Sequence, residues 1–495
     1  MIDYSEIAIA VVADECRKSF FYFVKTFWDV IIKEEPVYNW HIPFLCDELQ
    51  KLSVSIVERK PKPYDLIINI PPGTTKSTIV TVMWPVWLWT QDASIRIITN
   101  SYSSALSIDH AMKSKDIIES DKFRRLFPKI EIRHDKSGKQ NYENTDTGYR
   151  YATSTGATIT GFHAHVIIND DPVNPKQAES EQMRMAANEH TKTLSSRKVD
   201  KANTPVVTIM QRLHEDDVTG YLLKKKGDSP GKDQGHGGIR HICLPAELSD
   251  DVKPAELRER YVDGLLDPVR LPRTVLDEAR TDLGSRGYAG QYAQRPTAAG
   301  GNIIKEGWFR HISLSEFRAL HFREPIHFFL DTAYNKKQKG RDNDPSGILG
   351  ACKIRNQIYI TCAQKVYKEF PDLIRFLPDF MAANDANEES TLRIEPKANG
   401  ISVCQQLQET SALNVTFTPS PTDAKDTRLY AVAPKIECGR VWIVDGDWNE
   451  EFIDEVCGFP SKSHDEYVDI LGYAINYFTE DTFVVPEYID SLIAI

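Results

Sequence analysis

The chain has 495 residues, of which 41% are hydrophobic and 26% are charged, a composition that excludes a disordered, collagen-like or disulfide-rich protein. The formal net charge of −11 indicates no overall attraction to nucleic acid, although local basic patches rather than the total decide phosphate binding. The longest apolar run, residues 82–89, is far shorter than the roughly twenty residues that a membrane-spanning helix needs, so no membrane association is expected. The eight cysteines form no CxxC pair and are expected to be reduced thiols, not zinc ligands.

Short strands alternate with helical segments in the first half of the chain. Strands are predicted at Leu66–Ile70, Ile95–Thr99, His165–Asn169 and Val206–Met210. Buried, β-branched runs of this kind usually belong to parallel sheets, so an α/β domain is expected over residues 1–280. Residues 281–310 are rich in Arg, Gln and Gly and are predicted to be a linker.

The segment 71–78, which follows the first predicted strand, is a candidate phosphate-binding loop. In such loops a lysine reaches the β- and γ-phosphates and the next hydroxyl ligates Mg²⁺, the roles expected of Lys76 and Ser77. The loop departs from the general pattern because Ile70 and Thr75 stand where glycines are usual. The alternative is a polar strand-to-helix turn with Lys76 as an exposed surface charge.

Two later strands end in polar residues that suit the same site. The strand 165–169 leads into adjacent carboxylates, and such a pair is unfavourable to bury without a cation. Asp170 is predicted to hold Mg²⁺, and Asp171 to polarise the attacking water, although glutamate is more common in the second role. Gln211 and Arg212 follow the strand 206–210, where nucleotide motors place groups that sense the γ-phosphate. A salt-bridged loop is the alternative there.

The second half of the chain brings a different set of acids to strand ends. Strands are predicted at His327–Leu330, Ile348–Cys352, Gln357–Thr361, Leu392–Ile394 and Val441–Val444, and helices at about 371–384, 400–410 and 465–479.

Asp331 and Glu395 each follow one of these strands, while Asp465 and Asp469 lie one turn apart at the start of the last helix. Three acids from two strands and a helix are what a two-metal phosphodiesterase requires. Asp465 is the first choice for the third ligand and Asp469 the second.

Taken together, these motifs resemble the large terminase subunit of tailed bacteriophages, a DNA-packaging motor with an attached nuclease. The resemblance spans most of residues 35–480. Besides the acids of the second half, it rests on the Pro-Pro-Gly-x-x-Lys-Ser-Thr loop at 71–78, Ser101-Tyr102-Ser103, Thr160-Gly161, Asn169-Asp170-Asp171-Pro172 and the segment 210–217.

The resemblance implies a RecA-like P-loop ATPase domain over residues 1–280 and a ribonuclease-H-like nuclease domain over 311–480. The tail, 481–495, would be a docking peptide for another packaging component. ATP and Mg²⁺ would occupy the first domain, and two Mg²⁺ or Mn²⁺ ions the second. The nucleotide would contact residues from both motifs and an adenine-side motif, namely Gly73, Thr74, Thr75, Lys76, Ser77, Thr78, His41, Gln211 and Arg212.

Three roles remain open at this stage. His41 either contacts the base or has a capping or core role. The position of the family's early loop arginine is Gly73 here, so an arginine finger is sought in Arg150 or Arg212. Lys397 either contacts the scissile phosphate or pairs with Glu395.

The implied function is to cut concatemeric viral DNA and drive the duplex into a procapsid with ATP. Expected partners are double-stranded DNA, the portal protein and a small terminase subunit, with a ring on the portal and a monomer in solution. The expected location is the host cytoplasm, transiently on the procapsid and not in the mature virion. The alternatives are a host-type DNA translocase-nuclease and a structural packaging adaptor with decayed sites.

Overall fold

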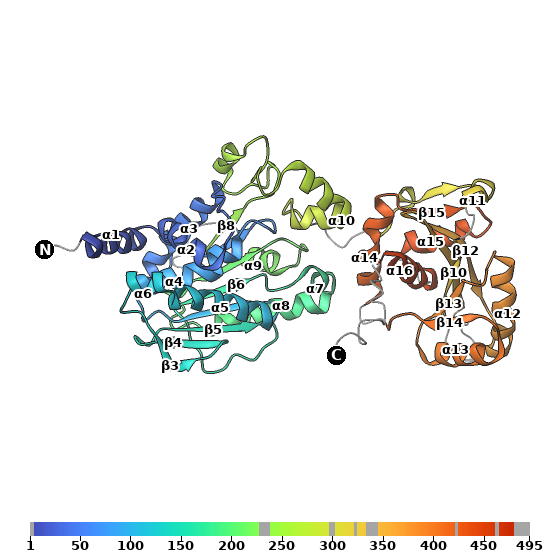
Figure 1. Ribbon diagram of the computed structural model, residues 1–495, viewed down its shortest axis with the longest axis horizontal. Helices are drawn as coiled ribbons and strands as arrows, with labels where there is room; N and C mark the ends of the chain where they lie inside the picture. The colour runs from blue at the N-terminus through green and yellow to red at the C-terminus, as the bar shows by residue number, and fades with distance from the viewer. Residues whose placement is uncertain are drawn as a thin grey trace, which may run out of the picture. The chain divides into compact units, whose positions relative to one another are not determined.

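The computed structural model describes residues 4–226, 238–296, 302–320, 324–332, 345–420, 424–460 and 465–479. The chain divides into two compact units, residues 1–299 and 300–495 (Figure 1). Each unit is built on its own mixed sheet with helices, which confirms the predicted α/β fold class. No helix in these described ranges is long and apolar enough to cross a membrane.

The elements of the first unit are helices and strands in alternation after a helical start. They are α1 (Tyr4–Lys18), α2 (Phe20–Ile31), α3 (His41–Val57), β1 (Tyr64–Asn69), η1 (Thr78–Met83), α4 (Trp84–Gln91), β2 (Ile97–Ser101), α5 (Ser104–Glu119), α6 (Asp121–Leu126), β3 (Ile132–Ser137), β4 (Asn141–Asn144), β5 (Tyr149–Ser154), β6 (Val166–Asp170), α7 (Pro175–Glu179), α8 (Glu181–Ser195), β7 (Val206–Met210), α9 (Val218–Lys226), β8 (Gly238–Cys243), η2 (Ala255–Arg260) and α10 (Arg273–Gln291).

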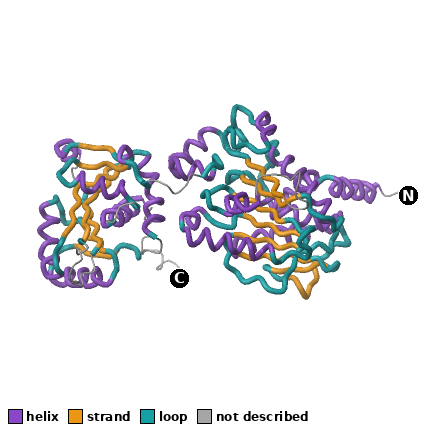
Figure 2. The backbone as a smooth tube through the Cα atoms, turned by 180° about the vertical axis from the view of Figure 1, so that it is seen from behind, coloured by secondary structure: helices purple, strands orange, loops and turns teal. Residues whose placement is uncertain are grey.

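The sheet of the first unit has the order β3-β4-β5-β2-β6-β7-β1-β8. In this spatial order, the six strands β5, β2, β6, β7, β1 and β8 pair in parallel with their neighbours. β3 and β4 extend the sheet beyond β5 as antiparallel strands. Because parallel strands end at the same edge, the segments that follow β1, β6 and β7 meet there. Figure 2 shows these strands running side by side through the middle of the unit, with helices beside them.

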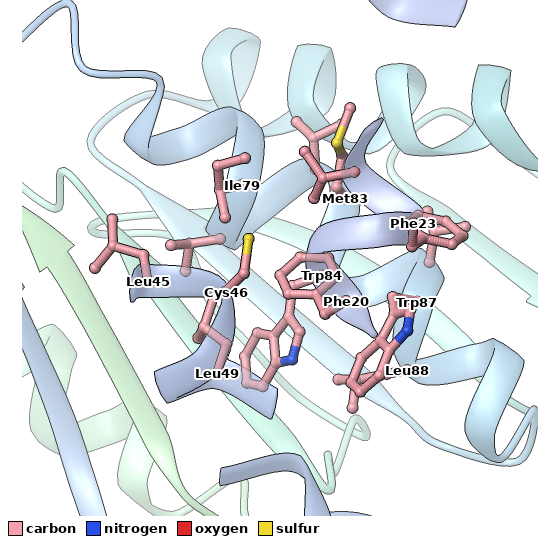
Figure 3. Close-up of a cluster of buried hydrophobic side chains, with 14 of the residues drawn as sticks. Phe20, Phe23, Leu45, Cys46, Leu49, Ile79, Met83, Trp84, Trp87 and Leu88 are labelled. Carbon is pink, nitrogen blue, oxygen red and sulfur yellow. The ribbon is translucent and has the colours of Figure 1, made fainter. Parts of the chain in front are cut away.

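The core beneath this sheet is dominated by α2, α3, η1 and α4, which are rich in large apolar side chains (Figure 3). Phe20, Leu49 and Trp84 are fully buried, and each such side chain contributes about 1.5–3 kcal/mol by leaving water. Trp84 is also satisfied as a donor, since its Nε1 lies 2.9 Å from Ser53 Oγ. This packing fixes η1 and the loop before it.

The second unit contains a shorter set of elements. They are η3 (Glu306–Trp308), β9 (Arg310–Ile312), α11 (Leu314–Leu320), β10 (His327–Asp331), β11 (Ser346–Ile354), β12 (Gln357–Val366), α12 (Phe370–Ala383), β13 (Thr391–Ile394), α13 (Ala398–Thr410), β14 (Asn414–Phe417), α14 (Lys425–Glu437), β15 (Val441–Val444), α15 (Asn449–Gly458) and α16 (Glu466–Thr479).

The second sheet has the order β14-β13-β10-β11-β12-β15-β9. β11 runs antiparallel to both of its neighbours, and the remaining pairs are parallel. One apolar cluster includes side chains from α14, α15 and α16, and a separate cluster includes side chains from α12 and α13. Residues 281–291, predicted as the start of a linker, are instead the end of helix α10, whereas the predicted tail 481–495 lies outside the described residues.

Candidate functional site

The loop between β1 and η1 adopts a conformation that fits a phosphate cradle. Gly73 has a φ of +76° and open space where a Cβ would stand. Thr75 has a φ of +60°, which is a strained conformation for a β-branched residue. The loop therefore takes a glycine-like conformation at the position where the general pattern has glycine. The Thr74 hydroxyl, which donates to the Pro71 carbonyl at 2.7 Å, closes this turn.

Lys76 and Ser77 meet the two carboxylates that follow β6. Lys76 is 6% exposed, so its alternative assignment as an exposed surface charge is wrong. Its Nζ lies 2.9 Å from Asp171 Oδ2, and the Ser77 hydroxyl donates to Asp170 Oδ1 at 3.0 Å. The parallel register that ends β1 and β6 at one edge explains this convergence of segments about 95 residues apart.

Burial raises the pKa of both Asp170 and Asp171, and the neighbouring Lys76 ammonium opposes that shift. Asp170 also accepts a hydrogen bond from the Thr81 hydroxyl at 2.6 Å. A buried acid whose charged form is disfavoured gains from a cation, and hydroxyl and carboxylate oxygens are the ligands that Mg²⁺ prefers. Ser77 and Asp170 thus fit a Mg²⁺ ion, and Lys76 fits the phosphates of a nucleotide.

Sequence reasoning missed two residues of this site, Thr81 and His110. Thr81 reaches Asp170 because Thr78–Met83 is a π-helix, a rare geometry that is frequent at functional sites. His110, on α5, is 7% exposed and places its Nδ1 3.5 Å from Asp170 Oδ2. Neither a π-turn nor a contact across the sheet leaves a local sequence signal.

His41 holds the loop in place, and its ring is fully engaged. Nε2 is 3.2 Å from the Thr74 carbonyl oxygen, and Nδ1 is 3.0 Å from the Asn39 side-chain amide. Burial lowers the pKa of His41 to about 4, so the ring is neutral at physiological pH. The contacts support the core alternative and leave no ring nitrogen for a base.

Gln211 and Arg212 lie directly beside the carboxylates. The Gln211 backbone N–H donates to Asp171 Oδ1 at 3.3 Å, and its side-chain Oε1 is buried without a hydrogen bond. Arg212 instead turns away and pairs with the buried Asp217, with Nε 3.0 Å from Oδ2. Asp217 also accepts the backbone N–H of Gly220 at 2.9 Å, close to the start of α9. The salt-bridged-loop alternative therefore describes Arg212.

Arg150, the other candidate arginine finger, is committed to its own unit. It is 1% exposed; its Nη1 donates to Ser114 Oγ and its Nη2 to the Thr81 carbonyl at 2.7 Å. An arginine in this position supports the π-helix and is inaccessible to a neighbouring subunit.

A second site lies at one end of the sheet in the second unit. Asp331, Glu395 and Asp469 each present a carboxylate oxygen within 4.8 Å of the others, the one such acidic group found among the described residues. The sheet places two of them, because Leu330 pairs with Ile394 and the Glu395 N–H donates to the Leu330 carbonyl at 3.1 Å. The first turn of α16 supplies Asp469, which is 3% exposed.

The order of preference for the third acid is reversed in the structure. Asp465 precedes α16 and pairs with Lys425 Nζ at 2.8 Å, outside the cluster. Asp469 lies one turn inside the helix and turns toward the sheet end, where Asp331 and Glu395 stand.

The electrostatics of the three acids fit divalent metal ions. Burial, followed by the neighbouring Glu395, raises the pKa of Asp331 to about 8. Burial also acts to raise the pKa of Glu395, but its contacts with Asp331, Lys397 and Tyr473 bring that pKa below its ordinary value. Glu395 Oε2 and Asp469 Oδ2 are buried oxygens that face lysine ammonium groups, and a metal ion could take the place of either ammonium.

Three cations surround this cluster, and only Lys397 was singled out from the sequence. Lys397 Nζ lies 2.8 Å from Glu395 Oε2, so it pairs with that acid here. Lys425 and Arg428, both on α14, pair with Asp469. They escaped notice because α14 lies some forty residues before Asp469 and carries no motif of its own.

Residues 381–478 match the family model of the terminase RNaseH-like domain. No curated protein matches the chain.

Among solved structures, the large terminase of the thermophilic bacteriophage D6E is 11% identical, with a TM-score of 0.48 over 86% of this chain and 98% of that one. The HK97 bacteriophage large terminase is 9% identical, with a TM-score of 0.35 over 90% and 96% of the two chains. The human cytomegalovirus terminase nuclease domain is 13% identical, with a TM-score of 0.28 over 36% of this chain and 96% of that domain.

The family match, not these distant structural likenesses, carries the assignment, and it falls on the segment that holds Glu395, Arg428 and Asp469. The family match therefore bears out the predicted resemblance to terminases for residues 381–478 of the second unit.

Proposed function

We propose that the protein is a viral DNA-packaging motor, which hydrolyses ATP to move double-stranded DNA into a procapsid and cleaves concatemeric DNA. The observation that carries this proposal is the coexistence of two built sites on one chain. One joins Lys76 and Ser77 to Asp170 and Asp171, and the other gathers Asp331, Glu395 and Asp469. The terminase family match on the second unit supports the nuclease role.

At the first site, each residue has a defined task in phosphoryl transfer. The backbone N–H groups of residues 73–78 cradle the phosphates, and Lys76 leaves Asp171 to neutralise them. Ser77 and Asp170 would hold Mg²⁺, which would supply charge neutralisation at the transferred phosphoryl group. Asp171, released from Lys76, orients the attacking water. Gln211 is bonded to Asp171 through its backbone N–H. It is therefore placed to pass the loss of the γ-phosphate to the segment 212–217 that follows it.

At the second site, the three acids would hold divalent metal ions, and the chemistry that such ions would supply is activation of water and stabilisation of the leaving oxygen of a phosphodiester. The burial of Glu395 and Asp469 strengthens their binding of a divalent ion, because a carboxylate in a low-dielectric environment binds a dication more tightly than an exposed one. Contacts to the duplex are expected to be mostly to phosphates, so cleavage would show little sequence dependence.

ATP hydrolysis by the purified chain, with and without DNA and procapsids, tests the motor. Lys76→Ala and Asp171→Asn are expected to lower turnover by at least about a hundredfold, since each removes a charge from the reacting centre. Lys60→Ala, a change at an exposed lysine, is the matched control and keeps the parent rate. Parent turnover that survives in both variants would refute the assignment.

Cleavage of duplex DNA in Mg²⁺ or Mn²⁺ tests the nuclease. Asp331→Asn and Asp469→Asn are expected to abolish nicking, whereas Asp465→Asn keeps it within a few-fold of the parent. Loss in Asp465→Asn together with retention in Asp469→Asn would restore Asp465 as the third ligand.

The partners and location follow from the same proposal: portal protein, small terminase subunit and a ring assembled on the procapsid in the host cytoplasm. Light scattering of the purified chain is expected to show a monomer without portal. A stable ring in solution would contradict that assembly route. The protein would be a structural adaptor instead if Lys76→Ala and Asp331→Asn variants packaged DNA as well as the parent. A host-type translocase-nuclease would be favoured if DNA cleavage and ATP hydrolysis occurred but did not respond to procapsids.

A further inference from the structure

One arginine contacts the carboxylate centre of the second unit through two routes. Arg428, on α14, donates from Nη2 to Asp469 Oδ1 and from Nη1 to the Tyr473 hydroxyl at 2.6 Å. The Tyr473 hydroxyl donates in turn to Glu395 Oε1 at 2.8 Å. The donor directions are consistent, because a guanidinium only donates and a phenol can accept one hydrogen bond while donating another. A single side chain thereby holds acids from β13 and α16.

The oxygens that this network leaves over are the ones that suit a metal. Each of the two acids uses one oxygen, Glu395 Oε1 or Asp469 Oδ1, for the network. The remaining oxygens, Glu395 Oε2 and Asp469 Oδ2, are buried, take no part in the network and face the ammonium groups of Lys397 and Lys425. A hydrogen bond that holds one oxygen of a carboxylate also sets the direction of the other oxygen. Hydrogen bonds from residues behind the metal ligands generally orient those ligands in this way.

The other two cations at the centre differ from Arg428 in their freedom to leave. Lys397 and Lys425 lie 2.8 and 2.9 Å from the two remaining oxygens, but their side chains are 51% and 33% exposed. The Arg428 side chain is 15% exposed and Tyr473 is 8% exposed. A lysine on a flexible stem exchanges a carboxylate for water readily, whereas a forked guanidinium bonded at both ends does not.

We propose that Arg428, acting with Tyr473, is the positioning residue of the nuclease centre, and that Lys425 and Lys397 are placeholder cations that metal ions displace. Asp331 needs no such partner, because the pairing of β10 with β11 and β13 sets its place. This inference rests on the proposed nuclease function and adds the residues that determine how its ligands face the metals.

Mn²⁺ binding to the full chain without nucleotide or DNA, measured by calorimetry, tests the inference separately from catalysis. Tyr473→Phe removes one hydroxyl and keeps the ring, and it is expected to weaken Mn²⁺ binding about 10–100-fold. Arg428→Lys keeps the charge but loses the fork, and the same direction is expected. Lys425→Met removes a competing cation and is expected to tighten binding several-fold. ATP hydrolysis and thermal unfolding of each variant verify that the chain remains folded.

The outcomes separate this inference from the function on which it rests. Unchanged Mn²⁺ affinity in Tyr473→Phe and Arg428→Lys, in a parent whose binding is lost in Asp331→Asn, would overturn the inference and leave the nuclease assignment standing. If Lys425→Met weakened Mn²⁺ binding as much as Arg428→Lys does, the inference would also be overturned. Lys425 would then be a fixed partner of Asp469 and not a placeholder cation. A parent that binds no Mn²⁺ at Asp331 would overturn both. Cleavage that returns in Tyr473→Phe at high Mn²⁺ supports a positioning role.

Discussion

Metal binding at the second site is expected to release a proton, because Asp331 is protonated in the metal-free protein at neutral pH. Burial and the adjacent Glu395 raise the pKa of Asp331 to about 8. Only the ionised carboxylate is a metal ligand, so protons compete with Mn²⁺ for this oxygen. The perturbation that tests this reasoning is a change of pH from 6 to 9 in the otherwise intact protein.

The magnitude follows from the pKa of Asp331 alone. With a pKa of about 8, roughly one molecule in ten has Asp331 ionised at pH 7, and about nine in ten at pH 9. The apparent Mn²⁺ affinity should therefore fall about tenfold for each pH unit below 8 and level off above it. Binding should release about 0.9 proton at pH 7 and about 0.1 at pH 9.

Calorimetric titration with Mn²⁺ in two buffers of different ionisation enthalpy gives the affinity and the proton release together. Asp331→Asn is the control, because it removes the titrating group and should lose the pH-dependent binding at the second site, so that any binding at Ser77 and Asp170 can be subtracted. A parent affinity that is flat from pH 6 to 8, without proton release, would refute the reasoning and mean that Asp331 is already ionised beside Glu395.

Three further predictions concern positions whose surroundings differ sharply. Gly400→Ala should reduce DNA cleavage at least about tenfold while ATP hydrolysis continues, as a nicking assay would measure. The reason is that the added Cβ would stand 2.1 Å from the Glu395 carbonyl oxygen and would displace the backbone of that metal ligand. Phe452→Ala should lower the free energy of unfolding by about 3–5 kcal/mol in a urea titration, since this fully buried ring lies in the core of the second unit. His165→Asn should reduce the loss of stability on acidification. Burial lowers the pKa of His165 to about 4, so the unfolded chain takes up the proton first and the parent loses stability as the pH falls from 6.5 towards 4, by at most about 1.4 kcal/mol per unit.

The glycine prediction has a matched control variant, and each of the three predictions has an outcome that would contradict it. Gly472→Ala lies on α16 near the same centre and has no atom within 4 Å of its Cβ, so it should keep cleavage and gain about 0.5–1 kcal/mol of helix stability. Equal loss of cleavage in both glycine variants would show that the centre tolerates no change at all nearby. An unfolding energy unchanged in Phe452→Ala would place the ring outside the cooperative core. Identical acid unfolding of His165→Asn and parent would mean that the ring titrates normally.

The strand pattern was the part of the fold most open to prediction. All nine predicted strands are present, because short β-branched runs between polar or glycine-rich turns form buried parallel strands with little dependence on context. Among the described residues, the strands β3, β4, β5, β8, β9 and β14 were missed, and four of them, β3, β8, β9 and β14, lie at the edges of the two sheets. Because parallel strands end on the same side of a sheet, the strand pattern also predicted where Lys76, Asp171, Asp331 and Glu395 lie.

The rest of the sites depended on geometry that no local pattern encodes. Whether Asp465 or Asp469 faces the sheet is decided by where α16 begins, and helix boundaries are uncertain by a turn when read from sequence. His41 and Arg150 were candidate functional residues because of the family resemblance, but their contacts serve the loop and the π-helix. Arg428 reaches the centre from a helix with no motif.

The π-helix η1 has a genetic consequence. Its turn holds one residue more than an α-helical turn, as the bond from the Trp84 N–H to the Ile79 carbonyl shows, and such a segment is equivalent to an α-helix with a single inserted residue. Loss of one codon within 78–83 would restore a regular helix and keep the flanking loop and the buried tryptophans of α4 in register. We expect the protein still to fold, with Thr81 rotated away from Asp170, so the loss would be felt at the phosphate site and not in the core.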